Sequence, residues 1–433
     1  MPKFHYSSRH LGFFLFICFP ASQPSRNTLK MKEITSRKMA WIIVLFLLLA
    51  GSALTFFPQN QKDSSPDYAD VWMLSPFVKQ KQFYPILQAE VNAEFSCPVT
   101  HKKVKWQESY LFNPAAVVKD DKVYLVFRAE DKIGRFGGTS RLGLAVSSDG
   151  VSFTKSPAPV LFPDNDNNLE YEREGGCEDP RIVETDEDTF IMTYTAFNGQ
   201  LARLCIASSP DLLKWQKHGL AFGKAQNGSY RDLWSKSGAI VCRLNKGHLI
   251  AARINGKYWM YWGESEIFLA TSENLIDWEP VERTEFLTKR FASYEGNGQY
   301  KTILENPRKA FRTALTTRNS RFDNGLVEPG PPAILTSKGI LFLYNAMSYQ
   351  GDPSLPDGAY TVAQAMFDRK DPSVVIHRAE NFFLKAMGPD ETAGQLANTA
   401  FSEALVFFKG QWLLYYTMSE AKIGVAICKK NLF

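Results

Sequence analysis

Apolar stretches alternate with short polar turns along much of this chain, and several of these stretches resemble one another. One recurring stretch is an apolar strand with an alanine near its middle, followed by small polar residues and a turn. Its copies are LGLAVSSDGVSF from Leu142, LCIASSPDLLKW from Leu204, IFLATSENLIDW from Ile267, YTVAQAMFDRKDP from Tyr360 and IGVAICKKN from Ile423. Their alanines lie about 62, 63, 95 and 61 residues apart. This spacing predicts a repeated structural unit with one enlarged copy.

Two further strand patterns accompany each copy. A strand dense in aromatic residues precedes it: KVYLVFRAE from Lys122, TFIMTYTAF from Thr189, KYWMYWGES from Lys257, GILFLYNAM from Gly339 and WLLYYTMSE from Trp412. Another strand opens each repeat and is polar or small only at its start: FNPAAVV, EDPRIVE, KSGAIV, EPGPPAIL and FSEALVFF. Aromatic and β-branched residues favour pleated sheets that pack face to face. Three strands per repeat, with a fourth in the variable stretch, predict an all-β protein that is a five-bladed β-propeller.

The strand that opens each repeat would line the central channel of such a propeller. Its polar entry residues would then meet at one mouth of the channel: Asn113, Asp179, Lys236, Glu328 and Ser402. Because this convergence is how a propeller gathers side chains from distant repeats, we expect the functional site there.

The N-terminal part of the chain has a different pattern. The uncharged run from Trp41 to Phe57 directly follows a cluster of lysine and arginine residues. Basic residues before an apolar core keep the N-terminus in the cytoplasm and send the following chain across the membrane. The run is about the shortest that spans a bilayer, so cleavage and retention as an anchor both stay open, as does a start at Met31. We therefore expect an extracytoplasmic protein, periplasmic or secreted, whose contact with a membrane is limited to residues 41–57.

The pattern divides the chain into three parts. Residues 1–58 are the expected leader, with a signal peptide or membrane anchor. Residues 59–104 are a linker and a lead-in strand, and residues 105–433 are the catalytic propeller.

Composition excludes several classes of protein. The chain has 433 residues, of which 45% are hydrophobic and 22% charged, which suits a large packed body. The excess of basic over acidic residues behind the net charge of +5 lies before Trp41, where seven lysines and arginines face one glutamate. The remainder is nearly neutral and therefore a poor candidate for nucleic-acid binding. The six cysteines form no CxxC pair, so we expect buried thiols, and no metal or other cofactor is indicated.

The densest chemical signal is GGCEDPRIV from Gly175. Asp179 and Arg181 are two apart on a strand, so both side chains face the channel. A carboxylate beside a guanidinium stays ionised, and burial or a bound sugar hydroxyl would be needed before it could donate a proton. A purely structural ion pair is the alternative interpretation.

Several motifs in order resemble glycoside hydrolase family 130, over about residues 105 to 433. They are FNPAAV, FRAED, GGCEDPRI, MTYTA, the SxDLxxWxKxG run and VEPGPPA. The resemblance implies a five-bladed propeller that acts on β-mannosides. It implies that Asp179 donates a proton to the glycosidic oxygen, in some members through a sugar hydroxyl. It also implies a set of residues that hold the sugar at the cleavage subsite (Asn113, Arg128, Asp131 and Arg181) and a phosphate-binding role for Lys236 in the phosphorolytic members.

One departure from the family pattern concerns the acceptor. The third aromatic strand, KYWMYWGES, places Glu264 where phosphorylases of the family carry a basic residue. A carboxylate there would repel phosphate and could hold a water for attack, because phosphate recognition depends on cationic donors. The family's exported mannosidases resemble this arrangement. Glu264 and Glu328 are accordingly expected to join Asp179 in catalysis, and Asp357, in GDPSLPDGAY, is a candidate sugar ligand.

These features lead us to expect an exported, inverting β-mannosidase. It would use water to cleave β-1,2-linked or related mannooligosaccharides, or another mannose-containing glycan. Two alternatives stay open. The first is a mannooligosaccharide phosphorylase that uses inorganic phosphate and releases mannose 1-phosphate, which Lys236 supports. The second is a non-catalytic glycan-binding propeller, which would not need a convergent acid and base.

Overall fold

The structure is a computed structural model that describes residues 72–133, 138–283, 310–393, 397–419 and 422–430. Their regular secondary structure is almost exclusively β-strand, which confirms the predicted all-β class. The predicted leader, including the apolar run 41–57, lies outside the described residues, as does the first part of the predicted linker. No helix in the described ranges combines the length and the apolar character that crossing a membrane would require.

The first two sheets are antiparallel and follow the order of the chain. The first sheet contains β5 (Tyr110–Lys119), β6 (Lys122–Glu130), β7 (Ser140–Ser147) and β8 (Thr154–Lys155). The second sheet contains β9 (Gly176–Glu184), β10 (Phe190–Phe197), β11 (Ala202–Ser209) and β12 (Gln216–Leu220). Asp120 and Asp121, the two residues that join β5 to β6, both have positive φ angles. Such angles give the turn a twist that matches the twist of the paired strands.

The third and fourth sheets contain extra short strands. The third sheet comprises β13 (Ala239–Asn245), β14 (His248–Ala251), β15 (Arg253–Ile254), β16 (Lys257–Trp262), β17 (Ile267–Ser272), β18 (Trp278–Pro280) and β19 (Thr313–Leu315). The fourth comprises β20 (Leu326–Pro329), β21 (Ala333–Leu335), β22 (Ile340–Met347), β23 (Tyr360–Phe367), β24 (Val375–Arg378) and β25 (Leu384–Lys385).

The fifth sheet joins the two ends of the described chain. It contains β26 (Ala400–Phe408), β27 (Gln411–Met418) and β28 (Lys422–Cys428), and β1 (Val78–Lys79) and β2 (Leu87–Gln88) both pair with β28. A separate hairpin is formed by β3 (Glu94–Cys97) and β4 (Lys102–Lys105). The described α-helices, α2 (Leu169–Glu172) and α5 (Pro389–Thr392), are single turns.

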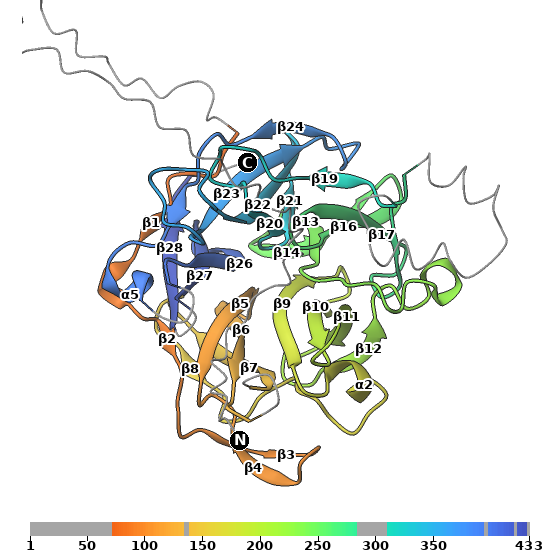
Figure 1. The fold of residues 1–433 in the computed structure, drawn as a ribbon, viewed down its shortest axis with the longest axis vertical. Helices are drawn as coiled ribbons and strands as arrows, with labels where there is room; N and C mark the ends of the chain where they lie inside the picture. The colour runs from red at the N-terminus through yellow and green to blue at the C-terminus, as the bar shows by residue number, and fades with distance from the viewer. Residues whose placement is uncertain (1–71, 134–137, 284–309, 394–396, 420–421, 431–433) are drawn as a thin grey trace, which may run out of the picture. The chain divides into compact units, whose positions relative to one another are not determined.

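The sheets are arranged in a ring with the strand that opens each sheet innermost (Figure 1). Some inner strands pair directly with the next sheet, as β13 does with β21, where Val241 lies opposite Ala333. Aromatic residues fill the space between sheets. Tyr261 of the third sheet, for example, lies 4.7 Å from Phe342 and Phe367 of the fourth, measured between ring centroids. The described cysteines are buried and unpaired, as the sequence predicts.

Candidate active site

The innermost strands carry bulges where the site is expected. On β5, Phe112 lies opposite Arg128 and Ala115 opposite Val126, so β5 has one residue more than its neighbour at Asn113. The same irregularity occurs on β9 at Asp179. Asn113 and Asp179 have φ angles of 45° and 50°. Asn and Asp adopt this left-handed conformation more readily than most residues, and a bulge turns their side chains out of the ladder.

Asp179 lies at the centre of a charged cluster formed by several sheets. Its Oδ1 accepts hydrogen bonds from Nδ2 of Asn113 at 2.8 Å and from Nη1 of Arg128 at 2.9 Å. Its Oδ2 lies 3.8 Å from Nζ of Lys236. Only 4% of the Asp179 residue is exposed. The structure thus brings together Asn113, Arg128, Asp179 and Lys236, four of the residues predicted from sequence.

Arg128 is held on several sides by acceptors. Its Nη2 lies 2.5 Å from Oε1 of Glu130 and 3.0 Å from Oε1 of Glu178, and its Nε donates to Oγ of Ser140 at 2.9 Å. The guanidinium also lies over the ring of Phe112, 4.6 Å from the centroid. These contacts restrain Arg128 so that Nη1 points at Asp179.

Lys236 connects Asp179 with the two predicted glutamates. Its Nζ lies 4.0 Å from Oε2 of Glu264, whose side chain is 31% exposed. The amide of Gly263 donates to the carbonyl of Lys236 at 2.9 Å, which ties the loop that carries Glu264 to this position. Glu328 is 5% exposed and accepts a hydrogen bond from the hydroxyl of Ser237. Glu264 therefore lies beside Lys236, and Glu328 is bonded to the next residue in the chain, Ser237.

Arg181, which the sequence predicts as a sugar ligand, is 1% exposed. Its Nε donates to the carbonyl of Gly330 at 2.8 Å and its Nη2 to that of Pro329 at 2.6 Å. Arg181 therefore binds the backbone of the strand that carries Glu328, which fixes the second sheet against the fourth.

The protonation of the cluster follows from burial and from the neighbouring cations. Burial would raise the pKa of Asp179, but Arg128, Lys236 and the hydrogen bond from Asn113 outweigh it and hold that pKa below its usual range. Burial would lower the pKa of Lys236, but the carboxylates around it, with Glu264 and Asp179 first, raise it. Asp179 is thus a carboxylate and Lys236 an ammonium at neutral pH.

Two other carboxyl groups behave in the opposite way. Burial raises the pKa of Glu178 to about 7, against the attraction of Arg128. Burial likewise raises the pKa of Glu328 to about 7, with Lys236 opposing the rise and Glu264 adding to it. A carboxyl group that titrates near neutrality can hold a proton or release it during a reaction.

Asp131 and Asp357, both predicted sugar ligands, do not join the cluster. Asp131 is fully buried, and its oxygens accept from the amides of Ile133 and Thr139 and from Nη1 of Arg141 at 2.6 Å. Asp357 is exposed and accepts from the amide of Gln350 at 2.8 Å. Both side chains therefore hold loops in this structure, and their sugar-binding roles stay predictions.

Sequence reasoning missed several members of the cluster. Glu130 and Glu178 stand inside the quoted motifs FRAED and GGCEDPRI, but the motifs do not reveal that both bind Arg128. Glu403 is a further case, because the sequence points to Ser402 as the entry residue of the fifth repeat. The register of β26 with β27 places Glu403 at the bulge instead, since Ser402 pairs with Tyr416 and Ala404 with Tyr415.

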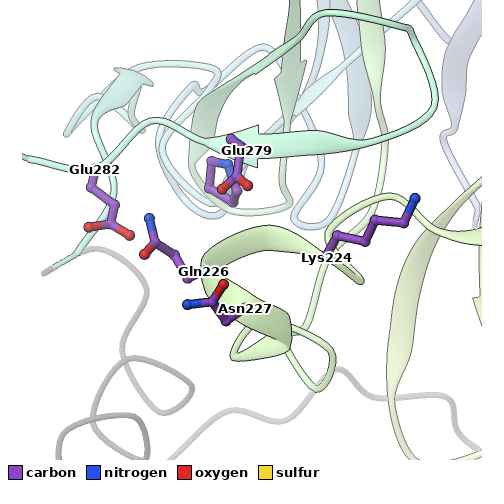
Figure 2. A pocket seen from close by; sticks show the side chains of 6 residues that line it. Lys224, Gln226, Asn227, Glu279 and Glu282 are labelled. Carbon is purple, nitrogen blue, oxygen red and sulfur yellow. The ribbon is translucent and has the colours of Figure 1, made fainter.

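A hollow on the outer part of the third sheet is separate from this cluster. Its volume is about 460 Å³, and it is lined by Lys224, Gln226, Asn227, Glu279, Pro280 and Glu282 (Figure 2). None of the predicted site residues is among them. The charged cluster, not this hollow, therefore defines the candidate active site.

Comparisons with known proteins agree with the motifs. The family profile described as beta-1,4-mannooligosaccharide phosphorylase, that of glycoside hydrolase family 130, matches residues 79–432. The chain belongs to glycoside hydrolase family 130. A 1,2-beta-oligomannan phosphorylase from a Thermoanaerobacter species is 27% identical, over 75% of this chain and 91% of the relative. A Beta-1,2-mannobiose phosphorylase from the same source is 25% identical, over 76% and 93%.

Solved structures of the family are also similar. A glycoside hydrolase structure from Bacteroides ovatus has 39% identity and a TM-score of 0.75, and the match covers 83% of this chain and 98% of that one. Another, with 39% identity, a TM-score of 0.75 and coverage of 82% and 94%, is described with the words "The GH130 family of mannoside phosphorylases contains glycoside hydrolases that target beta-1,2 mannosidic linkages in Candida mannan".

The names of the relatives contradict the expected hydrolysis by water. Both Thermoanaerobacter relatives are phosphorylases, as is a 23% identical relative from Listeria innocua that matches 66% of this chain. The structure shows why Glu264 misled the sequence argument. It is not an isolated carboxylate, since Lys236 lies 4.0 Å away and partly neutralises its charge. A glutamate at this position therefore does not exclude an anionic acceptor.

Proposed function

We propose that the protein is a β-mannoside phosphorylase. It would transfer a mannosyl group from a β-linked mannooligosaccharide to inorganic phosphate and release mannose 1-phosphate. The proposal rests mainly on the positions of Arg128 and Lys236, which both lie beside Asp179 in one largely buried cluster. The names of the relatives support phosphate as the acceptor. They also support β-1,2-linked mannooligosaccharides as the substrate class.

We propose a single displacement for the chemistry. Phosphate oxygen forms the new bond to the anomeric carbon while the bond from that carbon to the leaving oxygen breaks, and the leaving oxygen takes a proton. Lys236 and Arg128 supply the positive charge that phosphate needs. Asp179 supplies the proton, directly or through a sugar hydroxyl.

Phosphate itself would prepare Asp179 for this role. In the resting cluster Arg128 and Lys236 keep Asp179 ionised. A bound dianion would share these cations and reduce their pull on Asp179. Burial, which raises the pKa of a carboxyl group, would then dominate and let Asp179 hold a proton.

The ring of sheets supports the proposal of five blades. Each of the five antiparallel sheets would be one blade, and the fifth would be closed by β1 and β2 from the N-terminal side. This arrangement would put residues from four sheets, Asn113, Asp179, Lys236 and Glu328, around one channel.

The test is the product of cleavage with and without phosphate. Purified protein should release mannose 1-phosphate from β-1,2-mannobiose in proportion to added phosphate, and should synthesise the disaccharide from mannose 1-phosphate and mannose. A control with sulfate in place of phosphate should give no sugar phosphate. Equal release of free mannose in both buffers, with no sugar phosphate, would overturn the proposal.

A further inference from the structure

Glu403 is the fifth sheet's contribution to the ring of bulged residues. It occupies the extra position on β26, as Asn113 does on β5 and Asp179 on β9. The neighbouring Ser402 is engaged elsewhere, because its hydroxyl donates to the carbonyl of Tyr415 at 2.8 Å. By its place in the fold, Glu403 belongs to the site.

The surroundings of Glu403 do not suit a charged carboxylate. The residue is fully buried, and neither carboxyl oxygen has a hydrogen-bond partner among the described residues. Its cationic neighbour is Arg181, whose Nη2 lies 3.0 Å from Oε1 without hydrogen-bonding geometry. Buried polar groups are nearly always hydrogen-bonded, and a buried charge without such bonds is costly.

Arg181 does not depend on a charged partner either. Its Nε and Nη2 donate to the carbonyls of Gly330 and Pro329, and its Nη1 lies 3.3 Å from the carbonyl of Asp179. These backbone acceptors are neutral, so they bind the guanidinium nitrogens without compensating the positive charge. The carboxyl group of Glu403 packs against this guanidinium, with Oε1 3.0 Å from Nη2, and so limits where the side chain of Arg181 can lie.

The other charged groups near Glu403 shift its pKa in opposite directions. Burial raises the pKa of Glu403 well above its usual range, Arg181 opposes the rise, and Asp179 and Glu328 add to it. Lys236 opposes it more weakly than these groups. Carboxyl groups outnumber cations in the cluster, so an additional negative charge at Glu403 would repel an anionic acceptor.

We propose that Glu403 is an uncharged carboxylic acid that positions Arg181 and leaves the positive charge of that residue available to the occupant of the site. Glu403 acts through Arg181 and is therefore a positioning residue rather than a catalytic one. The identity of the occupant, a mannoside with phosphate, rests on the proposed function. The protonation of Glu403 does not.

Infrared spectroscopy of the full-length protein tests the protonation without turnover. The spectra should be recorded at about pH 9, where groups that titrate near neutrality are ionised. At that pH the wild-type protein should still show the carbonyl band of a buried carboxylic acid, and Glu403→Gln should lack the part of that band that Glu403 contributes. Identical spectra of the two proteins at that pH would overturn the proposal.

Steady-state kinetics, together with calorimetry of mannobiose binding, test whether Glu403 positions Arg181. Glu403→Ala should raise the KM for the mannooligosaccharide about tenfold or more, with a smaller change in kcat, because Arg181 loses its packing. Glu403→Gln should rescue most of that loss, since an amide has the shape of the neutral acid. If Gln and Ala are equally impaired while both are folded, the carboxyl group is needed in its charged form and the proposal is wrong.

Glu391 provides a matched control outside the site. It is 1% exposed, but its carboxylate accepts from Nζ of Lys79 at 2.5 Å and from the hydroxyl of Tyr416 at 2.6 Å. Glu391→Gln should therefore lower the unfolding temperature without removing the infrared difference assigned to Glu403. Calorimetry of mannobiose binding needs no acceptor, so a failure of the phosphate test would leave the infrared and binding results interpretable.

Discussion

Asp179 shows how the backbone and the charges of one residue depend on each other. Its left-handed conformation carries the carboxylate out of the ladder of β9 and into contact with Asn113, Arg128 and Lys236. Such a conformation costs free energy in a residue other than glycine, and the surrounding contacts have to stabilise it. The same contacts keep Asp179 ionised.

Changing Asp179 to Asn tests its role as the proton donor. The variant keeps the shape and the hydrogen bond to Asn113 but cannot supply a proton, so phosphorolysis should slow by about a hundredfold or more. Steady-state rates of mannose 1-phosphate release would measure the loss. Asp368→Asn, in a surface turn where the carboxylate accepts the amides of Lys370 and Asp371, is the control. Near-normal turnover by folded Asp179→Asn would contradict the assignment.

The raised pKa of Glu328 predicts that the stability of the protein depends on pH. Its pKa in the folded protein is raised from 4.5 to about 7, so between these values the folded state binds the proton more tightly than the unfolded state. Stability is therefore lost as the pH rises through this window. Glu328→Gln imitates the neutral acid and can still accept the hydrogen bond of Ser237.

Thermal unfolding across pH checks this expectation. Wild type and Glu328→Gln should unfold at similar temperatures near pH 4, and the variant should unfold at the higher temperature at about pH 8.5. A variant that is less stable than wild type at the higher pH would show that Glu328 is stabilised as a charged group. Its activity should be measured in parallel, since Glu328 is bonded to Ser237, the residue after Lys236.

At the scale of elements, the N-terminal strands are fastened to the last sheet by a buried ion pair. Lys79 of β1 lies 2.5 Å from Oε2 of Glu391 in α5, and their side chains are 9% and 1% exposed. The side-chain amide of Gln364 also binds both the amide and the carbonyl of Leu74. Gln364 belongs to β23 of the fourth sheet and Glu391 to α5, so these contacts join the N-terminal segment to two parts of the chain that are far away in sequence.

Removing Lys79 should cost far more than removing an exposed lysine nearby. Lys79→Met leaves Glu391 buried without its cation, which typically destabilises a protein by about 3–5 kcal/mol. Lys422→Met breaks an exposed pair with Asp390 and should cost about 1 kcal/mol or less. Denaturant unfolding of the two variants gives the comparison. Equal losses would show that the buried pair is not what fastens β1.

At the scale of the whole molecule, the ring of sheets brings charged residues from distant parts of the chain into one cluster. Asn113 and Glu403 are separated by most of the described chain, yet both occupy bulges on inner strands that lie side by side. Because the inner strands of several sheets contribute residues to the cluster, a change in the register of one strand would alter the site. The extra residue on β26, Glu403, is such a case, because the register of this strand with β27 places it at the bulge.

The predicted leader leads to a testable prediction about where the folded part of the chain is located. The apolar run 41–57 follows a basic cluster, so the chain after it should lie outside the cytoplasmic membrane. Protease added to intact spheroplasts should digest the body, while a cytoplasmic marker protein stays intact. Protection of both proteins would show that the body remains inside.

Much of the fold and part of the site could be predicted from local pattern. Alternating apolar residues, aromatic strands and the repeat spacing indicate antiparallel sheets, because these signals depend on neighbours along the chain. The repeat pattern also predicted that Asn113, Asp179 and Lys236 would meet, and the structure brings them together. The family followed from the motifs, because their order along the chain is read without knowledge of the structure.

The tertiary structure decided which residues the cluster contains and what charge they carry. The stretch FSEALVFF is compatible with an inward Ser402 or an inward Glu403, and the pairing of β26 with β27 selects Glu403. Asp131 lies directly after Glu130 at the end of the motif FRAED, but its carboxylate binds Arg141 and two loop amides. Glu264 suggested repulsion of phosphate until its distance to Lys236 was known. Register and charge pairing depend on segments remote in sequence, and for that physical reason the sequence alone determined the strands, whereas only the folded ring determined the chemistry at its centre.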